Sequence, residues 1–131
     1  MWKYCGVIRD EKNLHYGLEK LNNIENLLPF IDTRLENNNQ NDLIHKLDLQ
    51  SSLITAKATI LSAIERKESR GAHQRIDFKD TKDNCRFNIN VEMKDNRIII
   101  KKGVLKEINK ELIPLLQRSE KEVEIANKLL E

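Results

Sequence analysis

Glycine, proline and cysteine are all scarce in this chain. Its 131 residues include 4 Gly, 2 Pro and 2 Cys. So few Gly and Pro residues exclude collagen-like, mucin-like and Pro/Gly low-complexity sequences. Cys5 and Cys85 lie far apart and belong to no CxxC or Cys/His cluster, which excludes a disulfide framework and a zinc site. We therefore expect two free, inert thiols in a reducing compartment.

A large excess of charge of one sign and a long apolar run are also missing. The chain has 23 Lys and Arg against 21 Asp and Glu, a net charge of +2. A protein with so nearly balanced a charge does not bind nucleic acid or an anionic bilayer by its net charge alone. No run approaches the roughly 18 apolar residues that span a membrane, and the first residues lack the layout of a secretion signal. We expect a cytoplasmic protein that neither binds nucleic acid nor inserts into a membrane.

The sequence does have a helical periodicity of Leu and Ile. One stripe with steps of three and four residues predicts a helix over residues 10–35. Its members are Leu14, Leu18, Leu21, Ile24, Leu28, Ile31 and Leu35. Pro29 should bend or divide this helix, because proline removes a backbone donor and clashes with the preceding turn. Residues 36–41 then form a polar connector.

A second amphipathic stretch predicts a helix over about 42–68. Asn41 or Asp42 can cap its start, and a second cap at Asp48 or Ser51 would restart it after a short turn. Small alanine side chains are interleaved with its apolar positions, which lets a partner helix approach closely. We therefore expect the two helices to form an antiparallel pair.

The remainder of the chain changes period twice. Residues 68–84 are highly charged and have no amphipathic period, so we expect an irregular loop. Alternating apolar and polar residues then predict a β-hairpin over 86–102 that turns at residues 94–96. Helical spacing returns over about 104–131, where Pro114 indicates a break or a late start. The pattern predicts a single mainly α domain, with a β-hairpin after the second helix and a C-terminal helix.

Motifs of common enzyme classes are missing. The sequence has no GxGxxG, no phosphate-binding loop, no HExxH and no GxSxG. His15, His45 and His73 belong to three different predicted elements and lack metal-ligand spacing. Composition and motifs therefore indicate no catalytic residue, no cofactor-binding residue and no metal site.

One segment near the end of the second predicted helix is unusually rich in hydrogen-bonding side chains. Gly71 can adopt a left-handed backbone there and turn the chain sharply. Two interpretations stay open: a self-contained network of caps and ion pairs, or a docking or active-site surface. We call these residues the polar cluster; they are Arg66, Glu68, Ser69, Arg70, Gly71, His73, Arg75 and Asp77.

The same segment resembles a known signature. Residues 66–73, RKESRGAH, followed by Arg75, Asp77 and Phe78, resemble a motif near the C-terminus of the flavoprotein subunit of succinate dehydrogenase and fumarate reductase. The family includes L-aspartate oxidase, and residues 1–9, MWKYCGVIR, are similar to the start of its C-terminal helical domain. The resemblance implies a small helical bundle with a spectrin-repeat-like three-helix arrangement, attached to larger FAD-binding and capping domains.

The resemblance also implies a function for the polar cluster. The chain would be a C-terminal domain with a structural and docking role, in which Arg70 and Arg75 pair with groups of the FAD-binding domain. FAD would bind in the parent flavoprotein and not in this chain. We therefore expect the isolated chain to be an inactive fragment of an oxidoreductase.

Several alternatives remain at this point. Within the family, the resemblance favours a succinate dehydrogenase or fumarate reductase domain, and an L-aspartate oxidase domain is the alternative. Outside it, the chain would be an independent helical protein-interaction module, or a small enzyme that uses His73 with Asp77. Lys79 stands where the family commonly has proline. The resemblance further suggests an iron–sulfur subunit as an indirect partner, a parent at the cytoplasmic face of the membrane, and self-association through the exposed docking face.

Overall fold

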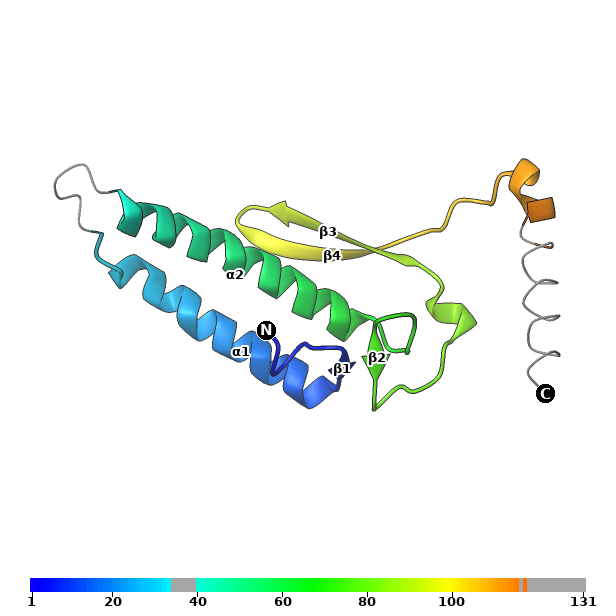
Figure 1. Cartoon of the computed structure of the whole chain (residues 1–131), viewed down its shortest axis with the longest axis horizontal. Helices are drawn as coiled ribbons and strands as arrows, with labels where there is room; N and C mark the ends of the chain where they lie inside the picture. Colours follow the sequence, from blue (N-terminus) through cyan, green and yellow to red (C-terminus); the bar gives the residue numbers. More distant parts are fainter. Residues whose placement is uncertain (34–39, 116, 118–131) are drawn as a thin grey trace.

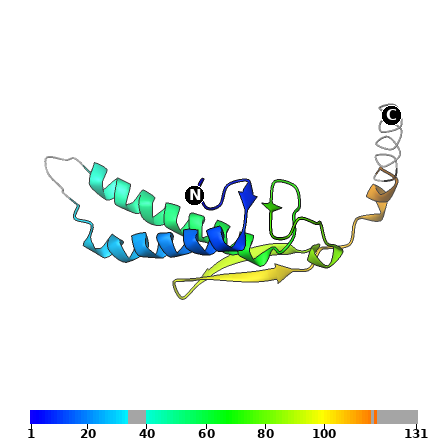
Figure 2. The same ribbon diagram turned by 90° about the horizontal axis from the view of Figure 1, so that it is seen from below.

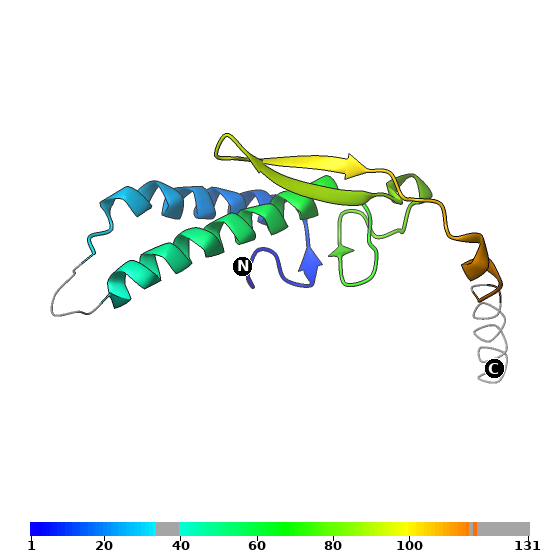
Figure 3. The same cartoon turned by 90° about the horizontal axis from the view of Figure 1, so that it is seen from above.

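The structure is a computed structural model that describes residues 1–33, 40–115 and 117. Two long helices lie antiparallel, and a β-hairpin runs alongside the second helix (Figure 1). Figures 2 and 3 show the hairpin on one side of the helix pair, with the N-terminal segment and the loop after the second helix on the other side. The predicted class, mainly α with a hairpin after the second helix, is confirmed.

Helix α1 (Glu11–Leu27) is preceded by its N-cap, Asp10. The carboxylate of Asp10 accepts a hydrogen bond of 2.8 Å from the backbone N–H of Asn13 in the first turn. This contact satisfies one of the free donors at a helix start. The helix gives way to a 3₁₀ turn, η1 (Leu28–Phe30), that contains Pro29. The predicted division at Pro29 is confirmed. The prediction that the helix extends to residue 35 is wrong for the residues that can be compared, because residues 31–33 are not helical. Residues 34–35 lie outside the described part.

Helix α2 (Asn41–Glu65) starts one residue earlier than predicted. Its N-cap is Gln40, which makes no side-chain capping bond. The prediction that Asn41 or Asp42 occupies the cap position is therefore wrong, because both residues belong to the first turn. A carboxylate in that turn, here Asp42, still favours the helix because it faces the positive end of the helix dipole.

The predicted restart of α2 at Asp48 or Ser51 is also wrong, because the helix continues without a break. The hydroxyl of Ser51 donates to the carbonyl one turn earlier at 3.1 Å, so it lies along the helix and caps nothing. The helix ends at Glu65 and not at residue 68. Arg66 leaves the helical conformation, with φ −85° and ψ 100°, and the chain turns into the polar cluster.

A small aliphatic core lies between the two helices and the N-terminal segment. Gly17 of α1 makes this packing possible, because a Cβ there would lie 2.8 Å from Cβ of Tyr4. Cys5 and Cys85 are free, as predicted, and burial raises the pKa of the Cys5 thiol. The buried members of the core are Cys5, Leu14, Ile60 and Ala63, and Leu18, Leu21 and Ile64 pack against them.

The hairpin consists of β3 (Asn88–Lys94) and β4 (Arg97–Gly103), which pair antiparallel after a short 3₁₀ turn, η2 (Asp83–Cys85). Asp95 and Asn96 connect the strands with φ values of 48° and 61°. Positive φ at both positions is typical of a type I′ turn, for which Asn and Asp are favoured. The predicted hairpin is confirmed, although its first strand begins at residue 88 and not at 86.

A second, very small sheet was not expected from the sequence. Strand β1 (Ile8–Arg9) pairs in parallel with β2 (Gln74–Arg75), and the N–H of Ile76 donates to the carbonyl of Arg9 at 3.0 Å. Such a short pair gives no periodic signal. The predicted loop over 68–84 is thus irregular for the most part, but it includes one strand that fastens the N-terminal segment to the polar cluster.

The C-terminal helix starts later than predicted. Residues 104–109 have no regular structure, and a 3₁₀ turn, η3 (Lys110–Leu112), precedes helical residues 113–115 and 117. Pro114 therefore lies at the start of the helix, where its missing N–H has no partner to lose. The late start is confirmed, and the predicted start near residue 104 is wrong. The predicted continuation over 118–131 lies outside the described residues.

Candidate functional site

The polar cluster lies where α2 ends and meets the N-terminal segment. The structure brings the eight predicted residues together in a network of hydrogen bonds around two buried side chains, and Gly71 contributes a turn of the backbone. Its two anchors are side chains with almost no exposed surface: Glu68, with 0% of its surface exposed, and Arg75, with 1%. Buried charges are stable only when they are paired and hydrogen-bonded. Both anchors have charged partners within the chain, which compensate for the cost of burying their charges.

Glu68 neutralises two arginines. Its carboxylate accepts bonds from Nη1 of Arg66 at 2.7 Å, and from Nε and Nη2 of Arg70 at 2.9 and 3.0 Å. It also accepts the backbone N–H of Lys82 at 2.9 Å. The bonds from Arg70, assisted by those from Lys82 and Arg66, lower the pKa of Glu68 to about 2 against the opposing effect of burial. Glu68 is thus a fixed anion that ties the loop together.

Arg75 joins three parts of the chain. It forms a bidentate pair with Asp77, at 2.7 and 2.6 Å, and this pairing lowers the pKa of Asp77 to about 2. Its Nη1 donates to the carbonyl of Ala63 at the end of α2 at 2.9 Å. Its Nη2 also reaches the carboxylate of Glu11 in α1 at 3.1 Å. The guanidinium therefore links α1, α2 and β2.

Ser69 and Gly71 shape the backbone of the cluster. The buried hydroxyl of Ser69 accepts the backbone N–H of Arg75 at 2.8 Å and donates to the carbonyl of Phe78 at 2.9 Å. Gly71 has a φ of 58°, the left-handed conformation that the sequence predicts. Around it, the backbones of Arg70 and His73 exchange two hydrogen bonds of 2.9 and 3.0 Å. The turn thereby presents His73 to the N-terminal segment.

His73 is held between two strong partners. Arginine can only donate, so Nδ1 of His73 must accept the 2.7 Å bond from Nη1 of Arg9, and Nε2 donates to the carbonyl of Arg66 at 3.1 Å. Burial lowers the pKa of His73, and the positive charges of Arg9, Arg75 and Arg66 lower it further. The ring is therefore neutral, and Asp77 lies against Arg75 and not against the imidazole. This arrangement provides no carboxylate–histidine pair for catalysis.

The structure confirms the interpretation of a self-contained network. Glu68 pairs with Arg70, and Asp77 pairs with Arg75, within the chain. Arg75 is buried against Asp77, and Arg70 pairs with Glu68 while part of its side chain stays exposed. That these arginines pair with groups of the FAD-binding domain stays a prediction. A docking role for the surface of the cluster stays a prediction, because no contact with another domain is described.

Sequence reasoning missed the contribution of the N-terminal segment. Arg9 and Glu11 bond to His73 and Arg75, which lie 64 residues further along the chain in each case. The only available signal was the resemblance of residues 1–9 to a family start. Neither spacing nor charge patterning relates these residues to the cluster.

Acid should weaken the fold through this network. The folded-state pKa values of Glu68 and Asp77 are about 2, below the ordinary values of 4.5 and 3.8. A carboxyl group with a lowered pKa stabilises the fold above its unfolded pKa, and this stability is lost as the pH falls through the folded pKa. We expect the urea midpoint of the chain to fall steadily between about pH 5 and pH 2.

The measurement is a series of urea denaturation curves from pH 7 downward. The matched control is Glu92→Gln, which removes a half-exposed carboxylate paired with Lys101 on the hairpin. Its curve should follow that of the wild type at every pH, because exposed pairs contribute little. A midpoint that stays constant from pH 6 to pH 3 would contradict the role given to the ion pairs of Glu68 and Asp77.

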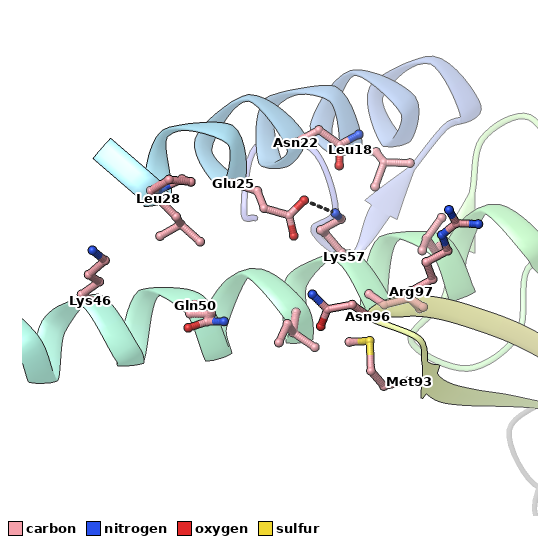
Figure 4. Close-up of a pocket in the computed structure, with 14 residues that line it drawn as sticks. Leu18, Asn22, Glu25, Leu28, Lys46, Gln50, Lys57, Met93, Asn96 and Arg97 are labelled. Carbon is pink, nitrogen blue, oxygen red and sulfur yellow. Dashed lines mark hydrogen bonds and ion pairs between the residues drawn. The ribbon is translucent and has the colours of Figure 1, made fainter. Parts of the chain in front are cut away.

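A groove of about 660 Å³ lies on the other side of the helices. Figure 4 shows Lys57 of α2 pointing to Glu25 of α1, with 2.7 Å between Nζ and Oε2. Lys46, also at the groove, donates to the carbonyl of Ile31 at 2.8 Å. These lysines thus have partners within the chain. The groove is lined by Leu18, Asn22, Glu25, Leu28, Pro29, Lys46, Gln50, Ile54, Lys57, Leu61, Met93, Asn96, Arg97 and Ile98.

The chain's own residues do not fit a flavin site. Its four glycines, Gly6, Gly17, Gly71 and Gly103, are too far apart to form the glycine-rich turn that admits a dinucleotide pyrophosphate. Among the described residues, no three His, Cys, Asp or Glu side chains are grouped so that they could hold a metal ion. In the same part of the chain, no helix has the length and apolarity to cross a membrane.

Comparison with known proteins decides the family. Residues 1–120 match the family model described as the fumarate reductase flavoprotein C-term. The chain belongs to this family. This C-terminal domain is 39% identical over 94 residues to an uncharacterized FAD-dependent oxidoreductase of Methanocaldococcus jannaschii. The matched region covers 72% of the chain and 17% of that protein.

Other relatives of this C-terminal domain carry both names that the sequence suggests. It is 38% identical to the L-aspartate oxidase of Pyrococcus horikoshii over 78 residues, which is 60% of the chain and 12% of the relative. It is 34% identical to the fumarate reductase flavoprotein subunit of Haemophilus influenzae over 82 residues, or 60% of the chain and 13% of the relative. The chain thus spans less than a fifth of each of these proteins.

Solved structures share the fold of the domain. A variant of the E. coli quinol fumarate reductase flavoprotein matches 83% of the chain and 20% of its own length, with a TM-score of 0.68 at 24% identity. Mycobacterium smegmatis Sdh1 in complex with UQ1 matches 89% of the chain and 20% of its own length, with a TM-score of 0.74 at 20% identity. At these identities, the likeness supports the fold alone.

Proposed function

We propose that this chain is the C-terminal domain of an FAD-dependent succinate dehydrogenase or fumarate reductase flavoprotein, in which it stabilises the FAD-binding domain. We call that whole protein the parent flavoprotein. The observation that carries the proposal is the match of residues 1–120 to the C-terminal family, combined with the short span of the chain along its relatives. The catalysis, the flavin and any iron–sulfur subunit belong to the parent.

An exposed apolar face beside the polar cluster supports the docking role. Trp2 is 87% exposed and Ile8 is 71% exposed, and Val7 and Ile76 are also exposed next to the β1–β2 pair. We call these four residues the apolar face. Large exposed apolar side chains that gather in one region of a fold indicate an interaction surface in soluble proteins. The polar cluster positions this face, since Arg75 anchors β2 and the strand pairing holds β1.

L-aspartate oxidase is a second candidate parent. The chain is 38% identical to the Pyrococcus horikoshii enzyme and 34% identical to the fumarate reductase subunit of Haemophilus influenzae, so sequence identity does not favour the fumarate reductase over the oxidase. Both parents would use the domain in the same way. The two are distinguished by assaying the parent flavoprotein with succinate, fumarate and L-aspartate.

The proposal predicts that the parent flavoprotein loses most of its flavin when this chain is deleted. The substitution Ile8→Asp should have the same effect in a milder form, because it places an unpaired charge in the interface. Both are measured as the flavin-to-protein ratio after gel filtration and as the temperature at which flavin fluorescence appears on heating.

Phe30→Asp is the matched control. Phe30 is 83% exposed in η1, at the opposite end of α1 from β1 (Figure 1), so the same change should leave the flavin content as in the wild type. If deletion of the chain left both the flavin content and the release temperature unchanged, the stabilising role would be refuted.

A further inference from the structure

The positive charges of three arginines act on His73, and two of these arginines have carboxylate partners. Arg66 pairs with Glu68, and Arg75 pairs with Asp77. Arg9 is the third, and within the described part of the chain its side chain donates to the carbonyl of Gly6 at 2.6 Å and to Nδ1 of His73 at 2.7 Å. Both of these acceptors are neutral. The positive charge of Arg9 is therefore not balanced at this site.

This imbalance is a property of the described part of the chain. Among residues 1–33, 40–115 and 117, no Asp or Glu oxygen lies within 4.0 Å of the Arg9 guanidinium, whereas each other arginine of the cluster has such a partner. Arg9 is also half-buried. A half-buried cation whose hydrogen-bond acceptors are both neutral favours an anion at close range.

Space for an anion lies next to Arg9. A hollow of about 520 Å³ opens between β1, α2 and β3, and Arg9 and His73 lie on its wall. The hydroxyls of Thr59 and Ser62, also on this wall, donate to carbonyls of their own helix at 2.8 Å, so they bring no charge. Arg66 also lies on this wall, but it pairs with Glu68. Among the described residues of the wall, Arg9 is thus the cation without a carboxylate partner that an entering carboxylate would meet, and the bond to His73 holds its guanidinium in place.

We propose that Arg9 binds an acidic side chain of the FAD-binding part of the parent flavoprotein. This inference rests on the proposed function. It favours a macromolecular partner because Arg9 is the neighbour of the exposed Ile8 in strand β1. Adjacent side chains of a strand point to opposite sides, so only a partner large enough to extend around β1 contacts both. Interfaces are built in this way, with apolar contacts beside arginine–carboxylate pairs.

The sequence span of the relatives identifies where that surface comes from. The chain covers 12–17% of the curated relatives described above, so most of each flavoprotein lies outside the part that corresponds to this chain. A second copy of the chain or a free dicarboxylate would offer the same chemistry to Arg9. These two sources are separated from the parent by the experiment.

The experiment is zero-length cross-linking of the parent flavoprotein that carries Arg9→Lys. A carbodiimide joins an amine to a carboxylate only when the two are in ion-pair contact. We expect a cross-linked peptide that connects the lysine introduced at position 9 to an Asp or Glu of the FAD-binding part within the same molecule. Arg97→Lys is the matched control, since Arg97 is exposed on the hairpin and makes no ion pair in the described part, and it should give no such peptide.

Any other result at position 9 overturns the inference. These results are a cross-link from position 9 to a carboxylate of this same chain, a cross-link from position 9 to a second molecule, a reaction at position 9 that added succinate abolishes because a free anion occupies the site, and no cross-link at position 9. A kinetic readout accompanies the mapping: Arg9→Gln should speed flavin release about tenfold, equivalent to about 1.4 kcal/mol, and Arg97→Gln less than twofold.

The two proposals fail in different ways. If the parent flavoprotein without this chain keeps its flavin, the stabilising function is wrong even when the cross-link forms. If deletion releases flavin but position 9 gives no cross-link to the FAD-binding part, the domain docks without the Arg9 contact. The isolated chain provides the remaining comparison. If Arg9 acted only within this chain, Arg9→Gln would lower the urea midpoint of the isolated chain as much as that of the parent flavoprotein.

Discussion

Glu68→Gln is expected to lower the free energy of unfolding by about 3 kcal/mol. The carboxylate has no exposed surface, and it neutralises Arg66 and Arg70 together. Glutamine has nearly the same shape, so it fills the space but leaves two guanidiniums facing a neutral amide. Its NH₂ group also cannot accept the hydrogen bonds that the second carboxylate oxygen receives from Arg70 and from the N–H of Lys82.

The measurement is urea denaturation of the chain at pH 7, read by far-ultraviolet circular dichroism. A loss of this size is a large part of the total stability of about 5–15 kcal/mol that is typical of a domain. Glu92→Gln is again the control and should change stability by less than about 0.5 kcal/mol, as exposed pairs do. Equal midpoints for the two variants would show that Glu68 does not anchor the loop.

Arg75→Met is the second change with a large expected effect, a loss of about 3 kcal/mol or more. Methionine keeps much of the buried volume but removes every donor. The carbonyl of Ala63 then loses the partner that satisfies it inside the protein, and the carboxylates of Glu11 and Asp77 lose their shared cation. Since this one side chain joins α1, α2 and β2, its loss should also release the N-terminal segment.

A titration distinguishes this mechanism from a simple packing defect. In the wild type, pairing with Arg75 holds the pKa of Asp77 at about 2. In Arg75→Met, we expect the pKa of Asp77 to rise towards its ordinary value of 3.8, measured by NMR of the side-chain carboxyl carbon. Arg97→Met, on the exposed hairpin, should change neither the stability nor this pKa. An unchanged pKa in Arg75→Met would contradict the proposed pairing.

Periodicity predicted the elements that are long enough to repeat. The Leu stripe predicted α1, and the strict alternation around Val91 predicted β3. Breaks caused by backbone chemistry were also predictable, because Pro29 and Pro114 act on their own turns. The restart of α2 at Ser51 was wrong because a serine side chain bonds equally well to its own helix.

Partners of the polar cluster could be predicted only within short range. Arg75 and Asp77 are two residues apart, so their pair follows from a local turn. The bonds from Arg9 to His73 and from Arg75 to Glu11 depend on how the helix pair returns the chain to its start. The sequence shows which charged residues are present, but it does not show which distant segments come into contact. For the same reason, the sequence did not predict that Arg9 lacks a carboxylate partner among the described residues.

The parallel pairing of β1 with β2 has a consequence for how the chain is made. Synthesis proceeds from the N-terminus, so residues 8–9 leave the ribosome before both helices, and their partners at 74–75 leave much later. Contacts between such distant segments form after local ones, because closing the long loop costs conformational entropy. Residues 8–9 therefore have to wait for residues 74–75 before they pair, and both helices are synthesised in the interval, whereas the strands of the β3–β4 hairpin pair with close neighbours in the sequence.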